Sequence, residues 1–144
     1  MPPHSPRPRG NAVSEIALPD SLGYTAEHEW IAVTPGSDAP SGPVRVGISA
    51  IAVEALGEIV YVELPEVGAA VTAGEPCGEI ESTKSVSELF SPATGTIAEV
   101  NTALVDDAAI VGNDPYGEGW LFAVEVTALG DLLTADAYRA ANSE

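Results

Sequence analysis

The sequence predicts a mostly β protein, a sandwich or barrel that also carries a few short helices. From about residue 22 onward, short runs rich in β-branched and aromatic residues alternate with turns that contain glycine and proline. Such spacing is typical of sandwiches and barrels. The chain has 144 residues, of which 45% are hydrophobic, so it can bury one core but is short for two full domains.

Seven segments have the composition of β-strands and are separated by turn residues. They cover residues 29–33, 43–48, 58–64, 77–82, 88–90, 96–100 and 120–126. The first two are joined by residues 34–43, a loop of Pro, Gly, Ser and Asp whose length can vary at little thermodynamic cost.

One short helix is predicted after the second strand. Ser49 is placed to cap it, apolar residues then recur at helical spacing, and Gly57 is a natural left-handed stop. Residues 102–111 fit a helical turn or a loop, and their periodicity does not decide between the two.

A second helix is predicted near the C-terminus. Thr134 is its candidate cap, and Asp136 lies near the positive end of the helix dipole. Leu132, Leu133 and Tyr138 form its predicted apolar side. We expect this helix to pack across the β core.

The first residues of the chain differ in composition from everything that follows. Residues 1–14 contain four prolines, two arginines and no acid, and they lack a pattern that could bury surface. We predict a flexible tail over residues 1–14 and one domain over residues 15–144.

The charge of the chain excludes several classes of partner. Five basic and 22 acidic side chains give a formal charge of −17, which repels nucleic acid and anionic membranes and favours partners with basic patches. No apolar run reaches the roughly 18 residues of a membrane span, and the start lacks the apolar region of a signal peptide. We expect a soluble, cytoplasmic, monomeric protein.

The cysteine and histidine content excludes two kinds of framework. Cys77 is the only cysteine, so no internal disulfide can form, and two histidines are too few for a zinc cluster. We interpret Cys77 as a small apolar strand residue.

Lys84 is the only lysine of the chain and lies in the segment ESTKSVSELFSP. If residues 77–82 and 85–90 are strands, Thr83 and Lys84 form a two-residue connection, and the amine lies at the open tip of a hairpin. The turn propensity itself is poor, because two-residue turns favour glycine-containing pairs. A solvated lysine among acids is the ordinary alternative.

Carboxylates surround this lysine. In the hairpin register Glu79 faces Glu88, and like charges directly opposite each other destabilise a ladder. An enzyme could use Glu81 and Glu88 as paired carboxylates and Lys84 as an imine-forming nucleophile. A catalytic amine needs a lowered pKa, however, which nearby carboxylates oppose, and no phosphate loop or nucleophile elbow is present. An accessible amine on a rigid β scaffold suits a carrier that another enzyme acylates.

Four motifs together resemble one family. The sequence is similar to the H proteins of the glycine cleavage system from about Leu22 to about Ala140, through YTAEHEW (24–30), EALGEIVYVELPEVG (54–68), ESTKSVSELFSPATGTIAEVN (81–101) and NDPYGEGWL (113–121). The first and last motifs distinguish H proteins from ordinary lipoyl domains. Biotin carriers usually flank their lysine with methionines, whereas Thr83 and Ser85 flank Lys84 here.

The resemblance implies a barrel-sandwich hybrid with lipoate in amide linkage to Lys84, attached by a lipoate ligase or an octanoyl or lipoyl transferase. It implies three further partners. The P protein, a glycine decarboxylase, passes an aminomethyl group to the arm, and the T protein, an aminomethyltransferase, moves the one-carbon unit to tetrahydrofolate. The L protein, dihydrolipoamide dehydrogenase, then reoxidises the arm. The chain itself is expected to transport without catalysing a step.

The resemblance carries over to a few acidic positions. Glu29 and Glu88 match acids that line the cleft where the loaded arm folds back, and their ordinary alternative is strand polarity. Glu81 is a candidate for recognition by the lipoylating enzyme. His28, beside Trp30, is expected to pack and to form hydrogen bonds rather than to catalyse.

The sequence departs from the family in the first predicted helix, where Ala50, Ile51 and Val53 occupy positions that are commonly polar. We expect a partner-specific face or tighter packing there. Two other functions stay open: a lipoyl donor that relays the group to other lipoyl proteins, and an unmodified interaction module.

Overall fold

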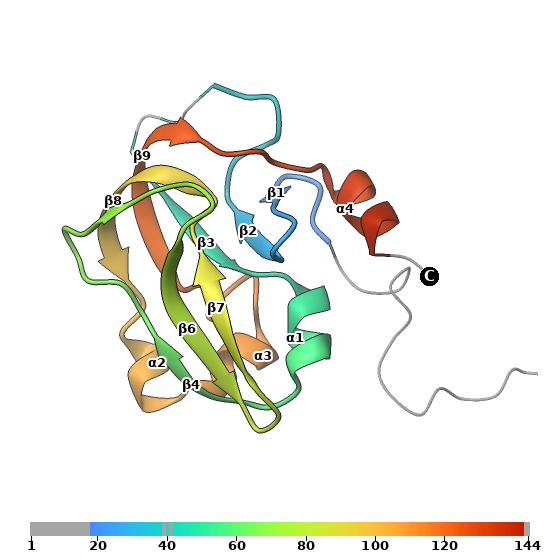
Figure 1. The fold of residues 1–144 in the computed structure, drawn as a ribbon, viewed down its shortest axis with the longest axis vertical. Helices are drawn as coiled ribbons and strands as arrows, with labels where there is room; N and C mark the ends of the chain where they lie inside the picture. The colour runs from blue at the N-terminus through green and yellow to red at the C-terminus, as the bar shows by residue number, and fades with distance from the viewer. Residues whose placement is uncertain (1–17, 39, 41, 143–144) are drawn as a thin grey trace, which may run out of the picture.

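The computed structural model describes residues 18–38, 40 and 42–142. Two antiparallel sheets face each other in it (Figure 1). One has the strand order β1-β2-β3-β9-β8-β5, and the other has the order β4-β6-β7. The strands are β1 Gly23–Tyr24, β2 Glu29–Ile31, β3 Pro43–Ile48, β4 Ile59–Glu63, β5 Ala70–Val71, β6 Pro76–Ser82, β7 Val86–Phe90, β8 Ala93–Val100 and β9 Phe122–Leu129. This architecture confirms the predicted mostly β barrel-sandwich hybrid.

All seven predicted strands are present, with ends that differ by a few residues, and β3 has the predicted bounds. The prediction missed β1 and β5, which have two residues each. A segment of two residues has no periodicity, so only its partner strand identifies it: β1 pairs with β2, and β5 pairs with β8.

The first predicted helix is confirmed as α1, Ala50–Leu56. The Ser49 hydroxyl accepts the N–H of Ala52 at 3.2 Å, and Gly57 ends the helix at φ 81°. Val53 packs against a large aliphatic cluster of buried side chains, and Ile51 packs against a smaller aromatic one. These unusual apolar residues of the helix therefore serve packing.

The ambiguous segment after β8 forms two short helices, α2 Ala103–Asp106 and α3 Ala109–Asn113. They lie beside β4 (Figure 1). Their single buried residues, Leu104 and Val111, anchor them to the core, which explains why neither shows a repeating apolar pattern.

The C-terminal helix α4, Ala135–Ala141, is confirmed together with its cap, because the Thr134 hydroxyl accepts the N–H of Ala137 at 3.1 Å. The prediction was wrong about Leu132 and Leu133, which precede the helix. The backbone of Leu133 exchanges two hydrogen bonds with that of Tyr24, at 2.7 and 3.0 Å, and extended pairing of this kind keeps it out of the helix.

Two clusters of buried side chains fill the interior. The larger consists of aliphatic residues and Phe122, and both sheets contribute to it. The smaller is aromatic and is covered by α4, where the rings of Tyr24 and Tyr138 stack with centroids 4.9 Å apart. Burial of these clusters, rather than strand propensity, holds the two sheets together.

Some predictions concern the ends of the chain and the membrane. The predicted tail over residues 1–14 lies outside the described residues. Within the part of the chain that the structure describes, no helix has the length and apolarity needed to cross a membrane.

Candidate functional site

The hairpin of β6 and β7 places Lys84 at its tip, at the lower end of the molecule in Figure 1. Glu81 pairs with Val86, and the N–H of Ser82 donates to the Ser85 carbonyl, so Thr83 and Lys84 form the predicted two-residue connection. Lys84 is exposed. The predicted pairing of Glu79 with Glu88 is also present.

Ser82 stabilises this turn through its side chain. Its hydroxyl oxygen accepts the backbone N–H groups of Lys84 and Ser85, both at 3.1 Å, while its own N–H donates to the Ser85 carbonyl at 2.8 Å. A serine that bonds to backbone groups two and three residues on stabilises a turn in which neither Thr83 nor Lys84 takes a positive φ, so this turn does not need glycine. Ser82 is therefore a site residue that turn propensity alone missed.

The tip is also attached to the segment that follows α1. The N–H of Thr83 donates to the Glu58 carbonyl at 3.0 Å. The Lys84 side chain lies over Gly57, where an added Cβ would stand 3.1 Å from the lysine Cε. The backbone around the lysine is thus held at several points, whereas its amine remains accessible.

Glu29 lies on β2 and is buried, with 1% of its surface exposed. One carboxylate oxygen accepts the Thr25 hydroxyl at 2.6 Å, and the other accepts the backbone N–H of Phe90 at 3.1 Å. Burial raises the pKa of the Glu29 carboxyl to about 7, although both hydrogen bonds act to lower it. Glu29 therefore titrates near neutral pH, unlike an ordinary glutamate.

Glu81 and Glu88 lie on the solvent face of the three-stranded sheet and are exposed. Glu88 lines an open groove of about 380 Å³ together with three other glutamates; the complete lining is Glu63, Leu64, Pro65, Glu66, Pro76, Cys77, Gly78, Glu79 and Glu88. The two predicted cleft acids therefore differ: the Glu29 carboxylate is enclosed, whereas Glu88 faces an acidic groove.

His28 forms part of a hydrogen-bonded chain that ends at α1. Its Nδ1 lies 2.6 Å from the Tyr138 hydroxyl, which lies 2.6 Å from the Ser49 hydroxyl. Burial lowers the pKa of His28, so the ring is neutral at neutral pH. These contacts give His28 the packing and hydrogen-bonding role expected from the sequence.

Cys77 lies on β6 near Glu29. Burial, reinforced by the charge of Glu29, raises the pKa of its thiol to about 12, so the reactive thiolate is scarce at neutral pH. In the described part of the chain, no three His, Cys, Asp or Glu side chains are arranged to hold a metal ion.

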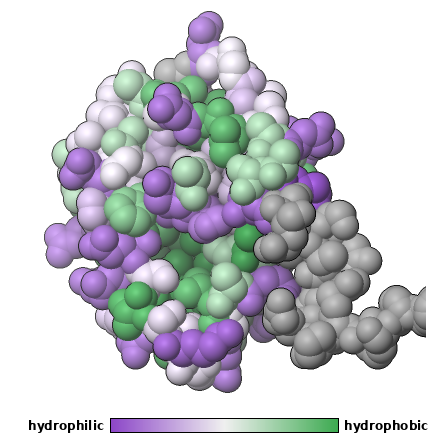
Figure 2. Space-filling model, turned by 45° about the vertical axis from the view of Figure 1, so that its right-hand side comes forward, coloured by the Kyte–Doolittle hydropathy of each residue, from purple (hydrophilic) through white to green (hydrophobic). Residues whose placement is uncertain are grey.

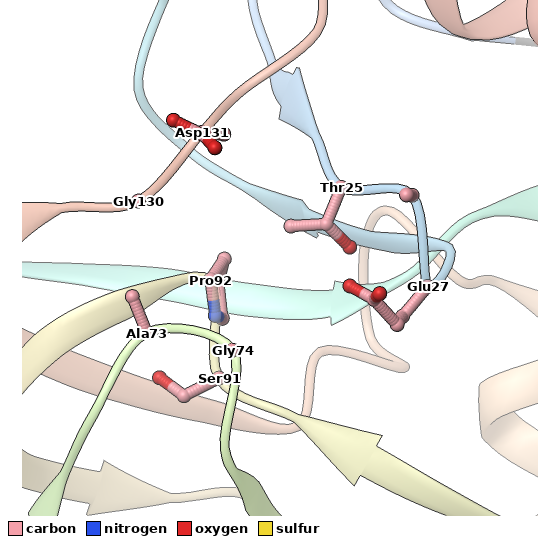
Figure 3. Close-up of a pocket in the computed structure, with 9 residues that line it drawn as sticks. Thr25, Glu27, Ala73, Gly74, Ser91, Pro92, Gly130 and Asp131 are labelled. Atoms are coloured by element: carbon pink, nitrogen blue, oxygen red, sulfur yellow. The ribbon is translucent and has the colours of Figure 1, made fainter.

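A second hollow of about 390 Å³ lies beside Gly74, which precedes β6, and Ser91, which follows β7, and so at the end of the hairpin away from its tip. Figure 3 shows its lining. It is lined by Thr25, Ala26, Glu27, Ala73, Gly74, Ser91, Pro92, Gly130 and Asp131. Glu27 and Asp131 add carboxylates to it, but none of the site residues predicted from the sequence lies in its wall.

Comparisons with known proteins agree on one family. A family model described as "Glycine cleavage H-protein" matches residues 22–144. The glycine cleavage system H protein of Corynebacterium aurimucosum is 55% identical over 125 residues, which cover 87% of this chain and 95% of that protein. The H protein of Thermobifida fusca is 57% identical over 124 residues, covering 85% and 94%.

A solved structure has the same fold. The crystal structure of a glycine cleavage system H protein from Mycobacterium marinum superposes with a TM-score of 0.85 and is 60% identical in sequence. The match covers 87% of this chain and 98% of that chain.

Proposed function

The chain belongs to the glycine cleavage H-protein family, and from that premise we propose that it is the lipoyl-bearing carrier of the glycine cleavage system. In this role it takes an aminomethyl group from the P protein to the T protein and then presents the reduced arm to the L protein. The observation that supports the proposal best is the position of Lys84, the only lysine, exposed at the tip of a hairpin that is held in place.

The residues around Lys84 fit an amide-linked lipoyl group. A modifying enzyme needs an accessible amine on a backbone of defined shape, and the hydrogen bonds of Ser82 and Thr83 define that shape. Gly57 has no side chain, which leaves space for the lysine Cε beside the backbone. When bound, lipoate would supply the disulfide chemistry, since the chain itself has one half-buried thiol of raised pKa.

Glu29 and Glu88 are the proposed docking acids for the loaded arm. Glu88 lies four residues beyond Lys84, about 13 Å along an extended strand, which a lysine with a long acyl chain can span. Its exposed carboxylate in the acidic groove suits a protonated amine. Glu29 has both oxygens engaged in hydrogen bonds, so it would act mainly by positioning β7 through Phe90.

The carrier is proposed to be non-catalytic, because the Lys84 side chain is exposed rather than enclosed in the kind of apolar site that activates a nucleophilic lysine. A lipoate ligase or an octanoyl or lipoyl transferase is the proposed modifying partner. The cytoplasmic location and the monomeric state stay predictions of the sequence.

Mass spectrometry after incubation with lipoate, ATP and a lipoate ligase tests the proposal. We expect the addition of one lipoyl group to the intact protein. Trypsin should then leave the peptide from Val46 to Arg139 uncut at Lys84, and the product should support glycine decarboxylation by P protein. Lys84→Arg should fold but accept no lipoyl group.

A lipoyl domain of known activity serves as the control for the ligase. Failure of the wild-type chain to gain mass while that control is modified would exclude the carrier function. Modification without any support of glycine decarboxylation would instead favour a lipoyl relay.

A further inference from the structure

Three large hydrophobic side chains are exposed next to the hairpin tip. They are Val60, Tyr61 and Val86, with exposed fractions of 47%, 54% and 58%, and we call them the tip patch. Figure 2 shows that hydrophobic and hydrophilic side chains alternate over the lower half of one face of the molecule.

The backbone of β4 is shaped so that two of these side chains are exposed together. The register of β4 with β6 shifts between Ile59 and Tyr61, so Val60 is the extra residue of a β-bulge. In a regular strand successive side chains point to opposite faces, and one of Val60 and Tyr61 would then face the core. The bulge exposes both, whereas Ile59 and Val62 remain buried.

The strand register brings the third member of the patch to the same face. Tyr61 pairs with Glu81, and Glu81 pairs with Val86. Tyr61 and Val86 therefore lie in one row across the sheet, on either side of Glu81. Lys84 lies between Glu81 and Val86 in the chain, and the N–H of its neighbour Thr83 donates to the carbonyl of Glu58, two residues before Val60. The tip patch is therefore adjacent to the modified lysine.

Acidic side chains border this patch. Glu81 lies within its row, and the next row of the sheet consists of Glu63, Glu79 and Glu88, each directly opposite the next. Such like-charged pairs cost stability, so they are poorly explained by folding alone. The arginines of the described residues, Arg45 and Arg139, lie on β3 and α4, outside this sheet.

We propose that the tip patch and its bordering glutamates form the docking surface for the enzyme that acylates Lys84. The matching surface on that enzyme is an apolar recess that receives Tyr61, bordered by arginine and lysine side chains. An aromatic anchor with a charged rim is the usual composition of a specific but transient interface. This inference rests on the proposed function, because it requires Lys84 to be modified.

Geometry favours the acylating enzyme as the occupant of this surface over the enzymes that react with the attached arm. Forming the amide requires its active site to reach the lysine Nζ, so its surface must cover the residues around the tip. An enzyme that reacts with the far end of the attached group can act at a distance from the hairpin. A patch adjacent to the lysine therefore fits the modifying step best.

Initial rates of lipoylation at a series of carrier concentrations test this docking surface. The unmodified protein is incubated with lipoate ligase, lipoate and ATP, and intact mass reports the product. Tyr61→Thr should lower kcat/KM about tenfold, mostly through KM, as expected for an interface anchor. Val86→Thr should lower it severalfold. Threonine keeps the β propensity at both sites.

Val67→Thr is the matched control, because Val67 is 61% exposed but lies in the turn after β4, away from the tip. It should change kcat/KM less than twofold, and thermal unfolding should show that all three variants are folded. Raising the salt concentration should lower kcat/KM for the wild type.

The two proposals fail in different ways. If the wild type is lipoylated and both Tyr61→Thr and Val86→Thr are lipoylated at its rate, the docking surface is wrong. If the wild type itself is never lipoylated, the carrier function fails instead.

Discussion

The carboxylate of Glu29 on β2 accepts the backbone N–H of Phe90 on β7 at 3.1 Å, and so connects the six-stranded sheet to the three-stranded one. Phe90 ends the strand that begins beside the lysine tip. A buried acid of the larger sheet thus helps to hold the hairpin that carries Lys84.

This carboxyl should make stability depend on pH. Its pKa of about 7 in the folded protein exceeds the ordinary value of 4.5, so the folded state binds the proton more tightly than the unfolded state. The stability from this group is fully present below pH 4.5 and is lost as the pH rises through 7. Between about pH 5.5 and about pH 8 we expect a loss of about 2 kcal/mol from it.

Glu29→Gln should remove that loss. The neutral amide can donate to the Thr25 hydroxyl and accept from Phe90, so both hydrogen bonds survive in modified form. Denaturant unfolding at the same two pH values measures the difference, and Glu54→Gln, on the exposed side of α1, should behave like the wild type. The same pH dependence in Glu29→Gln and wild type would contradict the assignment.

Gly57→Ala should destabilise the protein by about 1 to 3 kcal/mol, because φ is 81° there. The added methyl would also stand 3.1 Å from the Cε of Lys84, so the lysine must move. Thermal unfolding measures the loss. Gly112→Ala in α3 is the control: its Cβ would meet only ordinary contacts at 3.7 Å and beyond, so it should be neutral or stabilising. Equal effects of the two changes would refute this explanation.

Ser82→Ala should loosen the hairpin tip, because its hydroxyl accepts two backbone N–H groups. We expect a cost of about 1 to 2 kcal/mol, faster hydrogen exchange at the amides of Lys84 and Ser85, and slower lipoylation. Ser85→Ala keeps the backbone carbonyl that bonds to Ser82 and should leave exchange nearly unchanged. Unaltered exchange in Ser82→Ala would show that the turn does not need this side chain.

Tyr138→Phe should weaken the attachment of α4. The hydroxyl lies 2.6 Å from both His28 Nδ1 and the Ser49 hydroxyl, and its loss leaves polar groups without their partner. We expect a loss of about 1 to 3 kcal/mol in denaturant unfolding. Tyr61→Phe, at an exposed tyrosine, should cost almost nothing in stability. A Tyr138→Phe variant as stable as Tyr61→Phe would rule out this role.

Local chemistry allowed much of the fold to be predicted. Ser49 and Gly57 mark the ends of α1 and Thr134 marks the start of α4, because caps depend on a side chain and backbone groups a few residues away. The spacing of strand-like runs also predicted the two-residue connection at Thr83 and Lys84. Composition and spacing singled out Lys84 as the only lysine, between two strand-like runs, whereas its predicted role as the attachment site came from the family resemblance.

Only the tertiary structure decided how the site is built. The buried carboxylate of Glu29 accepts the N–H of Phe90, 61 residues away, and a strand pattern contains no information about that contact. The bulge at Val60 exposes Tyr61, although alternation would bury one of the two. Leu133 leaves the helical pattern to pair with Tyr24. The sequence by itself determined the caps of α1 and α4 and the approximate positions of seven strands. Contacts between distant segments determined the exact strand ends and which side chains are buried, exposed or brought beside Lys84, because burial and register are properties of the packed sheets.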